Sequence, residues 1–352
     1  MKAAGKEQKV GCWLLTVWIA VLGVGSASVW AEEGIKRNDA IVVSEGMLAA
    51  AGRSEVVTPA EAVALLPEAL QPASAQALTK AGANAAELIA AIEAADPAQR
   101  PGLGFLIANM PERDLKTLNA GYLIDNVQLA YQTREETPWG KLVPEDLFLD
   151  AVLPYANVSE RRDSWRADFY SRFLPIAKEA GTIEQAVKKL NQAVFQTLNV
   201  VYHPTKRPRP DASPYESIDS GYASCTGLSI LLVDALRAVG IPARLAGIPQ
   251  WTDHSGNHSW VEVWDQGWHF IGASEPSEYD QTWFAAKTAL ADPTRPEHRI
   301  YAVSFQNTGL SFPMVWAPTA RYVWALDVTA RYTADAPTVD SGQGRSVRMG
   351  NR

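Results

Sequence analysis

The feature that most constrains the fold is an abrupt change of hydrophobic pattern in the second half of the chain. Residues 225–239 place apolar side chains at helical spacing, Gly240 ends this helix, and Ile241-Pro242 leads into the next strand. Three runs typical of β-strands follow, at residues 243–248, 259–264 and 268–273. A helix followed by a short antiparallel sheet predicts an α+β core in which the helix packs on the sheet.

The residues before this core are predicted to form a helical N-terminal region, 59–180. It begins at Thr58-Pro59-Ala60-Glu61, where a capping threonine precedes a first-turn proline and a glutamate stands three residues after the cap. Helical periodicity recurs at residues 75–95, 103–109, 120–133 and 164–180. A long amphipathic helix over 182–198 then opens the core, which we bound at 181–298.

The connection over residues 199–220 is rich in proline, which predicts neither a helix nor a central strand there. Two β-like runs, 299–306 and 322–331, form a C-terminal segment, 299–332, that extends the sheet or begins a small separate β unit. The last residues, 333–352, are polar and contain glycine, and we predict that they are disordered.

The N-terminus has the three parts of a secretory signal, which we place at residues 1–31, before a flexible lead-in at 32–58. Lysines precede an apolar run at 10–24, and Val29-Trp30-Ala31 offers a cleavage site. A membrane anchor is the alternative, but the run is shorter than the roughly 20 apolar residues of a spanning helix. We therefore expect an exported protein, periplasmic or extracellular, with no stable membrane span after cleavage.

The overall charge narrows the class of partner. The formal net charge is -7, and no block of Lys and Arg interrupts the acidity, so we expect no nucleic-acid partner. With 47% hydrophobic and 20% charged residues, the chain has the composition of a globular protein with a packed core.

Cys225 is the one thiol that remains after the signal is removed, because the second of the two cysteines lies within it. It stands at the first position of the predicted helix. There the unpaired N–H groups and the positive end of the helix dipole favour thiolate over thiol and can bind the oxyanion of an acyl-transfer intermediate. A buried, unreactive cysteine is the alternative. The position is therefore that of a candidate nucleophile.

A cysteine nucleophile needs a base, and the chain has five histidines. Of these, His258 opens a strong strand pattern, where backbone pairing would hold the imidazole in a fixed direction. A structural histidine that only makes hydrogen bonds is the alternative. A metal site formed by His254, His258, Asp253 and Glu275 is disfavoured, because Ser255-Gly256 indicates a loop rather than a helix between the histidines. We expect no metal and no cofactor.

Three motifs in this order resemble the transglutaminase-like superfamily. They are Ser224-Cys225-Thr226-Gly227-Leu228, then Leu236 to Arg244, then His258-Ser259-Trp260-Val261-Glu262-Val263-Trp264. The resemblance covers roughly residues 190–275 and implies a papain-like catalytic core. It implies Cys225 as the nucleophile and His258 as the base that later acts as an acid.

The third member of the triad is where the sequence departs from that pattern. The superfamily usually has an aspartate near the end of the next strand, and the position counted from Trp268 falls on Gly272. Glu275 is the nearest carboxylate, and it precedes Pro276. If the hairpin pairs Asp265 with Trp268, His258 faces Glu275, whose carboxylate would then hold the imidazole tautomer. Ser274 or a backbone carbonyl is the alternative partner.

The resemblance implies a cysteine-dependent acyl-transfer enzyme that acts on amide bonds of a peptide or protein, including cell-wall or surface proteins. Gly272 to Pro276 also resembles a bacterial exported subgroup with an N-terminal helical region, which favours hydrolysis over cross-linking. The alternative is a catalytically silent binding or scaffold domain for peptides or glycans at the cell envelope. Aromatic residues near the site would serve such binding, although aromatics are more often core: Trp251, Trp260, Trp264, Trp268 and Trp283.

Overall fold

The structure is a computed structural model, and it describes residues 57–275 and 277–334. The predicted signal peptide, nearly all of the lead-in and residues 335–352 of the predicted disordered tail lie outside the described residues. Within the described ranges, none of the helices has the length and apolar character that crossing a membrane requires.

The N-terminal part of the described chain is helical, as predicted. The capping box at its start is confirmed, because the Thr58 N–H donates to Glu61 Oε2 at 2.8 Å and the Glu61 N–H donates to Thr58 Oγ1 at 3.3 Å. The helices are α1 (Pro59–Ala64), α2 (Gln71–Ala81), α3 (Ala85–Ala94), α4 (Arg100–Asn109), α5 (Glu112–Leu115), α6 (Ala120–Glu136), α7 (Glu145–Ala151) and α8 (Trp165–Lys178). The single helical run predicted over 75–95 is two helices, since Gly82 adopts a positive φ of 59° and breaks it.

The rest of the chain forms the predicted α+β core. Its helices are α9 (Ile183–Leu198), α10 (Pro214–Ser220), α11 (Cys225–Ala238), α12 (Ala285–Thr288) and α13 (Thr329–Thr333). Its main strands are β3 (Ala243–Ile248), β4 (His258–Trp264), β5 (Trp268–Ile271), β6 (Tyr301–Ser304) and β7 (Trp324–Asp327). They form one five-stranded antiparallel sheet in the order β5-β4-β3-β6-β7. The C-terminal strands therefore extend the core sheet.

Two predictions for the connecting segments are wrong. The proline-rich connection contains α10, because Pro214 stands at the first helical position, where its missing N–H costs nothing, and Ser213 and Glu216 form a capping box. The prediction that this connection holds no central strand is not contradicted, because β1 (Val201–Tyr202) is a two-residue strand that pairs in parallel with β2 (Tyr222–Ala223) in a separate two-stranded sheet. The second error is the β-like run at 322–331, in which β7 ends at Asp327 and α13 follows, through Thr333.

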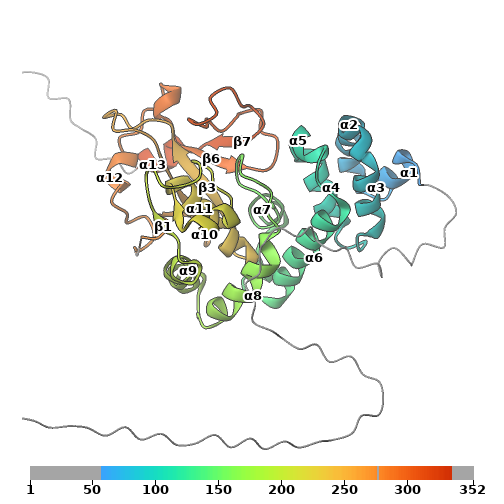
Figure 1. The fold of residues 1–352 in the computed structure, drawn as a ribbon, viewed down its shortest axis with the longest axis horizontal. Helices are drawn as coiled ribbons and strands as arrows, with labels where there is room; N and C mark the ends of the chain where they lie inside the picture. The colour runs from blue at the N-terminus through green and yellow to red at the C-terminus, as the bar shows by residue number, and fades with distance from the viewer. Residues whose placement is uncertain (1–56, 276, 335–352) are drawn as a thin grey trace, which may run out of the picture. The chain divides into compact units, whose positions relative to one another are not determined.

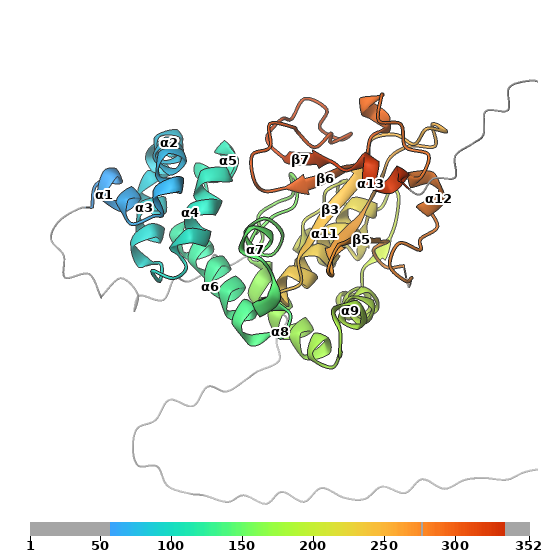
Figure 2. The same cartoon turned by 180° about the vertical axis from the view of Figure 1, so that it is seen from behind.

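Helix α11 lies at the centre of the core. Every residue after its first, from Thr226 to Ala238, is buried. The helix contacts β3 and β4 as well as α8 and α9, so it lies between the sheet and these two helices (Figures 1 and 2). A helix that is buried on every side depends on its neighbours for cover, and its charged side chains, such as Arg237, need hydrogen-bond partners.

Two buried arginines join α11 and α8 to the segment that precedes α8. Arg237 of α11 donates to four backbone carbonyls, three of them in residues 151–156 and the fourth on Ala243. Arg166 of α8 donates to the carbonyls of Val152, Leu153 and Pro154, the last of which it shares with Arg237, and to the carbonyl of Arg237. A guanidinium is tolerated in an interior only when its donors are bound in this way.

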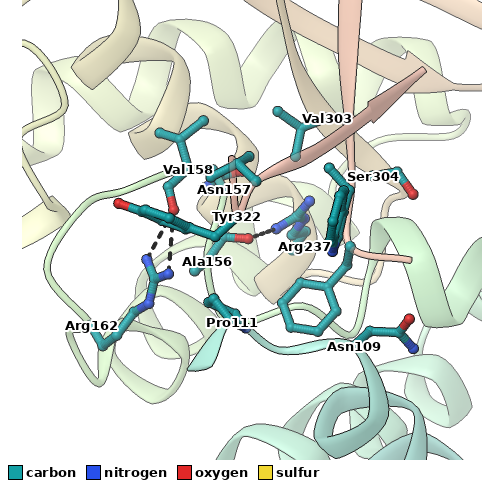
Figure 3. Close-up of a pocket in the computed structure, with 13 residues that line it drawn as sticks. Asn109, Pro111, Ala156, Asn157, Val158, Arg162, Arg237, Val303, Ser304 and Tyr322 are labelled. Carbon is teal, nitrogen blue, oxygen red and sulfur yellow. Dashed lines mark hydrogen bonds between the residues drawn. The ribbon is translucent and has the colours of Figure 1, made fainter. Parts of the chain in front are cut away.

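A small cavity lies beside this segment, where Asn109 and Pro111 meet β6 and residues 322–324 (Figure 3). Arg237 donates to the Ala156 carbonyl and Arg162 to the Val158 carbonyl at its edge, as Figure 3 shows. Its volume is about 30 Å³, which suits one or two water molecules rather than a substrate.

Candidate active site

Cys225 is the first residue of α11, as predicted, and its thiol is partly exposed. Ser224 caps the helix: its hydroxyl accepts from the Gly227 N–H at 3.1 Å and donates to the Pro210 carbonyl at 2.5 Å. Within the described part of the chain, the N–H groups of Cys225 and Thr226 have no backbone partner. The first turn therefore presents two donors and the positive end of a 14-residue helix dipole beside the sulfur.

His258 is the first residue of β4 and pairs with Ile248 of β3. Aromatic rings surround its imidazole, with ring centroids at 4.8 Å for Phe284, 5.0 Å for Trp283 and 6.0 Å for Trp260. Because this burial disfavours the imidazolium, it lowers the pKa of His258 to about 4, and the ring is neutral at pH 7. Its Nε2 is buried and has no hydrogen-bond partner among the described residues.

One cavity brings the three predicted catalytic residues together. Cys225, His258 and Glu275 all line it, and its volume of about 600 Å³ is that of a typical ligand site. Two tryptophans, Trp251 and Trp283, contribute to its wall. Polar and apolar side chains complete the lining, namely Tyr202, Leu228, Ser255, Asn257, Ser259, Ala273, Ser274 and Lys287.

A turn after β5 brings Glu275 to the site. Strand β5 ends at Ile271, Ser274 adopts a positive φ of 66°, and the Glu275 N–H donates to the Gly272 carbonyl at 3.2 Å. The chain thus folds back, and the Glu275 carboxylate lies over Gly272. A Cβ built on Gly272 would overlap Oε2 and Cδ of Glu275. The glutamate carboxylate therefore occupies the space into which a side chain at position 272 would extend.

The predicted register of the hairpin is wrong by one residue. Trp264, not Asp265, pairs with Trp268, because Asp265-Gln266-Gly267 forms the loop and Gln266 adopts a positive φ of 60°. Continued beyond β5, this register would place Ser274 rather than Glu275 opposite His258. Glu275 reaches the cavity through the turn at Ser274 instead, which a count along an extended strand does not describe.

The hydrogen bond of the Glu275 carboxylate goes to Trp283 rather than to His258. The indole Nε1 of Trp283 donates to Glu275 Oε1 at 2.8 Å. Partial burial raises the pKa of Glu275, and this hydrogen bond opposes the rise. The structure thus brings Glu275 to the cavity that Cys225 and His258 share, without a direct bond to the imidazole.

Asn191 of α9 is a residue of the site that our sequence analysis missed. Its Nδ2 donates to the carbonyls of Gly272 at 2.9 Å and Glu275 at 2.8 Å, and its Oδ1 accepts from the Ser274 N–H at 2.8 Å. The signal was present, since Asn191 is a polar residue on the buried apolar face of an amphipathic helix. A buried amide needs partners, and here the turn that carries Glu275 supplies them.

The other aromatic and histidine candidates lie in different places. Trp264 and Trp268 contact each other, with centroids 5.6 Å apart. His269 pairs with Asp280 at 2.7 Å. Across the described residues, no group of three or more His, Cys, Asp or Glu side chains is placed to hold a metal ion.

Comparison with known proteins supports the class of fold. Residues 174–273 match the transglutaminase-like superfamily, so this segment of the chain is a transglutaminase-like domain. It includes α9, α11 and strands β3 to β5, and therefore both Cys225 and His258. Searches among curated proteins and among solved structures gave no match.

The close packing of the carboxylate against Gly272 gives a direct structural prediction. Gly272→Ala should displace the Glu275 carboxylate and break its hydrogen bond to Trp283, because the added Cβ takes its space. The indole N–H resonance of Trp283, assigned with Trp283→Phe, should move upfield in the ¹⁵N–¹H spectrum. Gly267→Ala is the matched control, since a Cβ there meets nothing within 4 Å. An unchanged Trp283 resonance in Gly272→Ala would contradict this arrangement.

Proposed function

We propose that the protein is an exported, cysteine-dependent acyl-transfer enzyme that hydrolyses amide bonds of peptides or proteins. One observation carries the proposal: Cys225 at the N-terminus of α11 and His258 at the start of β4 line the same cavity of about 600 Å³. The transglutaminase-like domain at residues 174–273 supports it, because cysteine chemistry at amide bonds is typical of that superfamily.

In the proposed mechanism, neutral His258 takes the proton of the Cys225 thiol as the sulfur attacks the amide carbonyl carbon. Because Nε2 is the buried ring nitrogen, we assign Nδ1 to this proton transfer. The N–H groups of Cys225 and Thr226 stabilise the oxyanion. The imidazolium then protonates the leaving amine as the carbon–nitrogen bond breaks, which leaves a thioester. Water, deprotonated by His258, attacks the thioester, releases the carboxylic acid and restores the thiol.

Glu275 is proposed as the third catalytic residue. Burial opposes the imidazolium that forms during the reaction, and a carboxylate at Nε2 would stabilise it. Glu275 lines the cavity, and its carboxylate fills the space above Gly272, the position at which the superfamily has its aspartate. We propose that its second oxygen turns to the imidazole when the imidazolium forms.

Water is proposed as the acyl acceptor rather than an amine. Cross-linking needs room beside the thioester for an amine-bearing chain, whereas hydrolysis needs room for water alone. The neighbouring cavity that shares His258 has a volume of about 10 Å³ and is walled by Phe312, Pro313, Val315 and Trp316. This neighbouring cavity takes at most a single water molecule, so an amine-bearing chain would have to enter through the same cavity that holds the acyl group.

A silent binding domain is the second candidate, and one observation favours it. His258 Nε2 has no partner among the described residues, and Glu275 is bound by Trp283 instead. In this reading the aromatic walls bind a peptide or glycan and no thioester forms. In such a domain the alkylation rate of Cys225 would not depend on His258.

The predicted signal at residues 1–31 supports export to the periplasm or the extracellular space, where cell-wall or surface proteins are candidate substrates. Cleavage after residue 31 would remove the apolar run, which is also shorter than a spanning helix needs, so we propose no stable membrane span. We further propose that the chain belongs to the bacterial exported subgroup that carries an N-terminal helical region.

Activity should depend on both residues of the pair and fall at low pH. Release of soluble peptides from casein should be lost in Cys225→Ala and fall at least about 100-fold in His258→Ala. In the wild-type enzyme, kcat/KM should fall as His258 becomes protonated. Because burial lowers its pKa from 6.5 toward 4, the midpoint should lie between these values. Undiminished casein hydrolysis by Cys225→Ala would exclude the mechanism, and incorporation of dansylcadaverine faster than hydrolysis would exclude water as the main acceptor.

The role of Glu275 can be tested by returning the carboxylate to position 272. Glu275→Ala should lower casein hydrolysis about 10- to 100-fold, by analogy with the loss of an imidazole-orienting carboxylate. Gly272→Asp in the Glu275→Ala background should recover part of the loss, because the space is then free. Gly272→Asn in the same background is the uncharged control. Equal recovery by Gly272→Asp and Gly272→Asn would show that hydrolysis does not need a negative charge at position 272.

A further inference from the structure

We propose that Trp283 is a positioning residue for Glu275: its indole N–H fixes one carboxylate oxygen so that the other is presented to His258. The two side chains lie 2.8 Å apart at Nε1 and Oε1, and the indole lies against the imidazole, with ring centroids 5.0 Å apart. The inference rests on the proposed function, because it assigns Trp283 an effect only through Glu275.

The neighbouring residue fixes Trp283 beside the imidazole. Phe284 is fully buried and contacts the His258 ring at 4.8 Å, and its carbonyl accepts from the Lys287 N–H at 2.8 Å and the Thr288 N–H at 3.0 Å. The backbone at 283 is thus anchored by a buried ring and the first turn of α12. Trp283 is 61% exposed, so burial alone does not hold the orientation of its indole.

Glutamate at position 275 needs such an anchor more than aspartate would. It has an additional rotatable bond, and ordering a long side chain costs conformational entropy. Asn191 fixes the turn through three hydrogen bonds, but these reach only the backbone of Gly272, Ser274 and Glu275. The Trp283 indole acts on the carboxylate itself. Hydrogen bonds to a charged acceptor are about twice as strong as neutral ones, so this bond suits that purpose.

The polar atoms without a hydrogen-bond partner indicate which group the second carboxylate oxygen would bind. In the described part of the chain, Glu275 Oε2 has no hydrogen-bond donor and His258 Nε2 is buried without a partner. The other charged side chain that lines the cavity, Lys287, is bound to Asp253 at 2.8 Å and to Ser255 at 2.7 Å. The polar side chains of Tyr202, Asn257 and Ser274 also line the cavity but are neutral, whereas an imidazolium at His258 would carry the charge that complements Oε2, so we assign Oε2 to the imidazole.

The experiment is a double-mutant cycle on the reactivity of Cys225, with iodoacetamide as the probe. Alkylation rates from pH 4 to 9 are measured for wild type, Trp283→Phe, Glu275→Ala and the double variant. Phenylalanine keeps a ring against His258 and removes only the N–H. We expect Trp283→Phe to raise the pH midpoint of alkylation by roughly 0.5 to 1 unit, the size of one lost hydrogen bond. In the Glu275→Ala background the same substitution should have no effect.

Trp264→Phe is the matched control, because it makes the same chemical change at the far end of β4, and it should leave the midpoint unchanged. An equal effect of Trp283→Phe in both backgrounds would overturn the inference and make Trp283 a cavity wall that acts on His258 directly. A lower midpoint would also overturn it, since Trp283 would then hold the carboxylate away from the imidazole. If Glu275→Ala itself changes nothing, the proposed role of Glu275 fails and this inference fails with it.

Discussion

The structure depends on the complete burial of helix α11. Because every residue from Thr226 to Ala238 is buried, the helix needs cover on all sides, and the sheet, α8 and α9 supply it. Arg237 extends this dependence to the N-terminal region, since it is buried in the helix and binds carbonyls of residues 151–156. The first residue, Cys225, is the exception to this burial, and the exposed end of a buried helix is where a reactive thiol gains most from the dipole.

The same packing explains how the Glu275 carboxylate comes to lie over Gly272. Asn191 projects from α9, which packs on α11, and binds the turn that follows β5. That turn returns the Glu275 carboxylate to the space above Gly272. The Glu275 carboxylate therefore requires glycine at position 272, because a side chain there would take the space that the carboxylate occupies. The carboxylate arrives by a different backbone route at the place where a strand-borne residue would put it.

Much of the core was predictable because local patterns are strong there. The apolar helix after Cys225, the strands around His258 and the capping box at Thr58 are confirmed, since each rests on short-range periodicity or capping. Helix α10 was not predicted, because the high proline content of residues 199–220 argues against a helix. Pro214 stands at the first helical position, where proline is tolerated. The register of the hairpin was predicted wrongly, because Gln266 adopts a left-handed conformation that glutamine does not indicate in a sequence. Asn191 contacts a turn 83 residues away, and the Trp283–Glu275 bond joins side chains eight residues apart, and neither contact is encoded by local periodicity.

The central claim, that Cys225 and His258 form a nucleophile and base pair, is tested most directly by thiol reactivity. The measurement is the rate at which iodoacetamide labels Cys225 in the folded protein from pH 4 to 9, for wild type and His258→Ala. For such a pair we expect a midpoint well below the value of about 8.5 for an ordinary cysteine, and an upward shift of this midpoint in His258→Ala. Labelling that occurs only on unfolding, whichever residue occupies position 258, would contradict the account and identify Cys225 as a structural thiol.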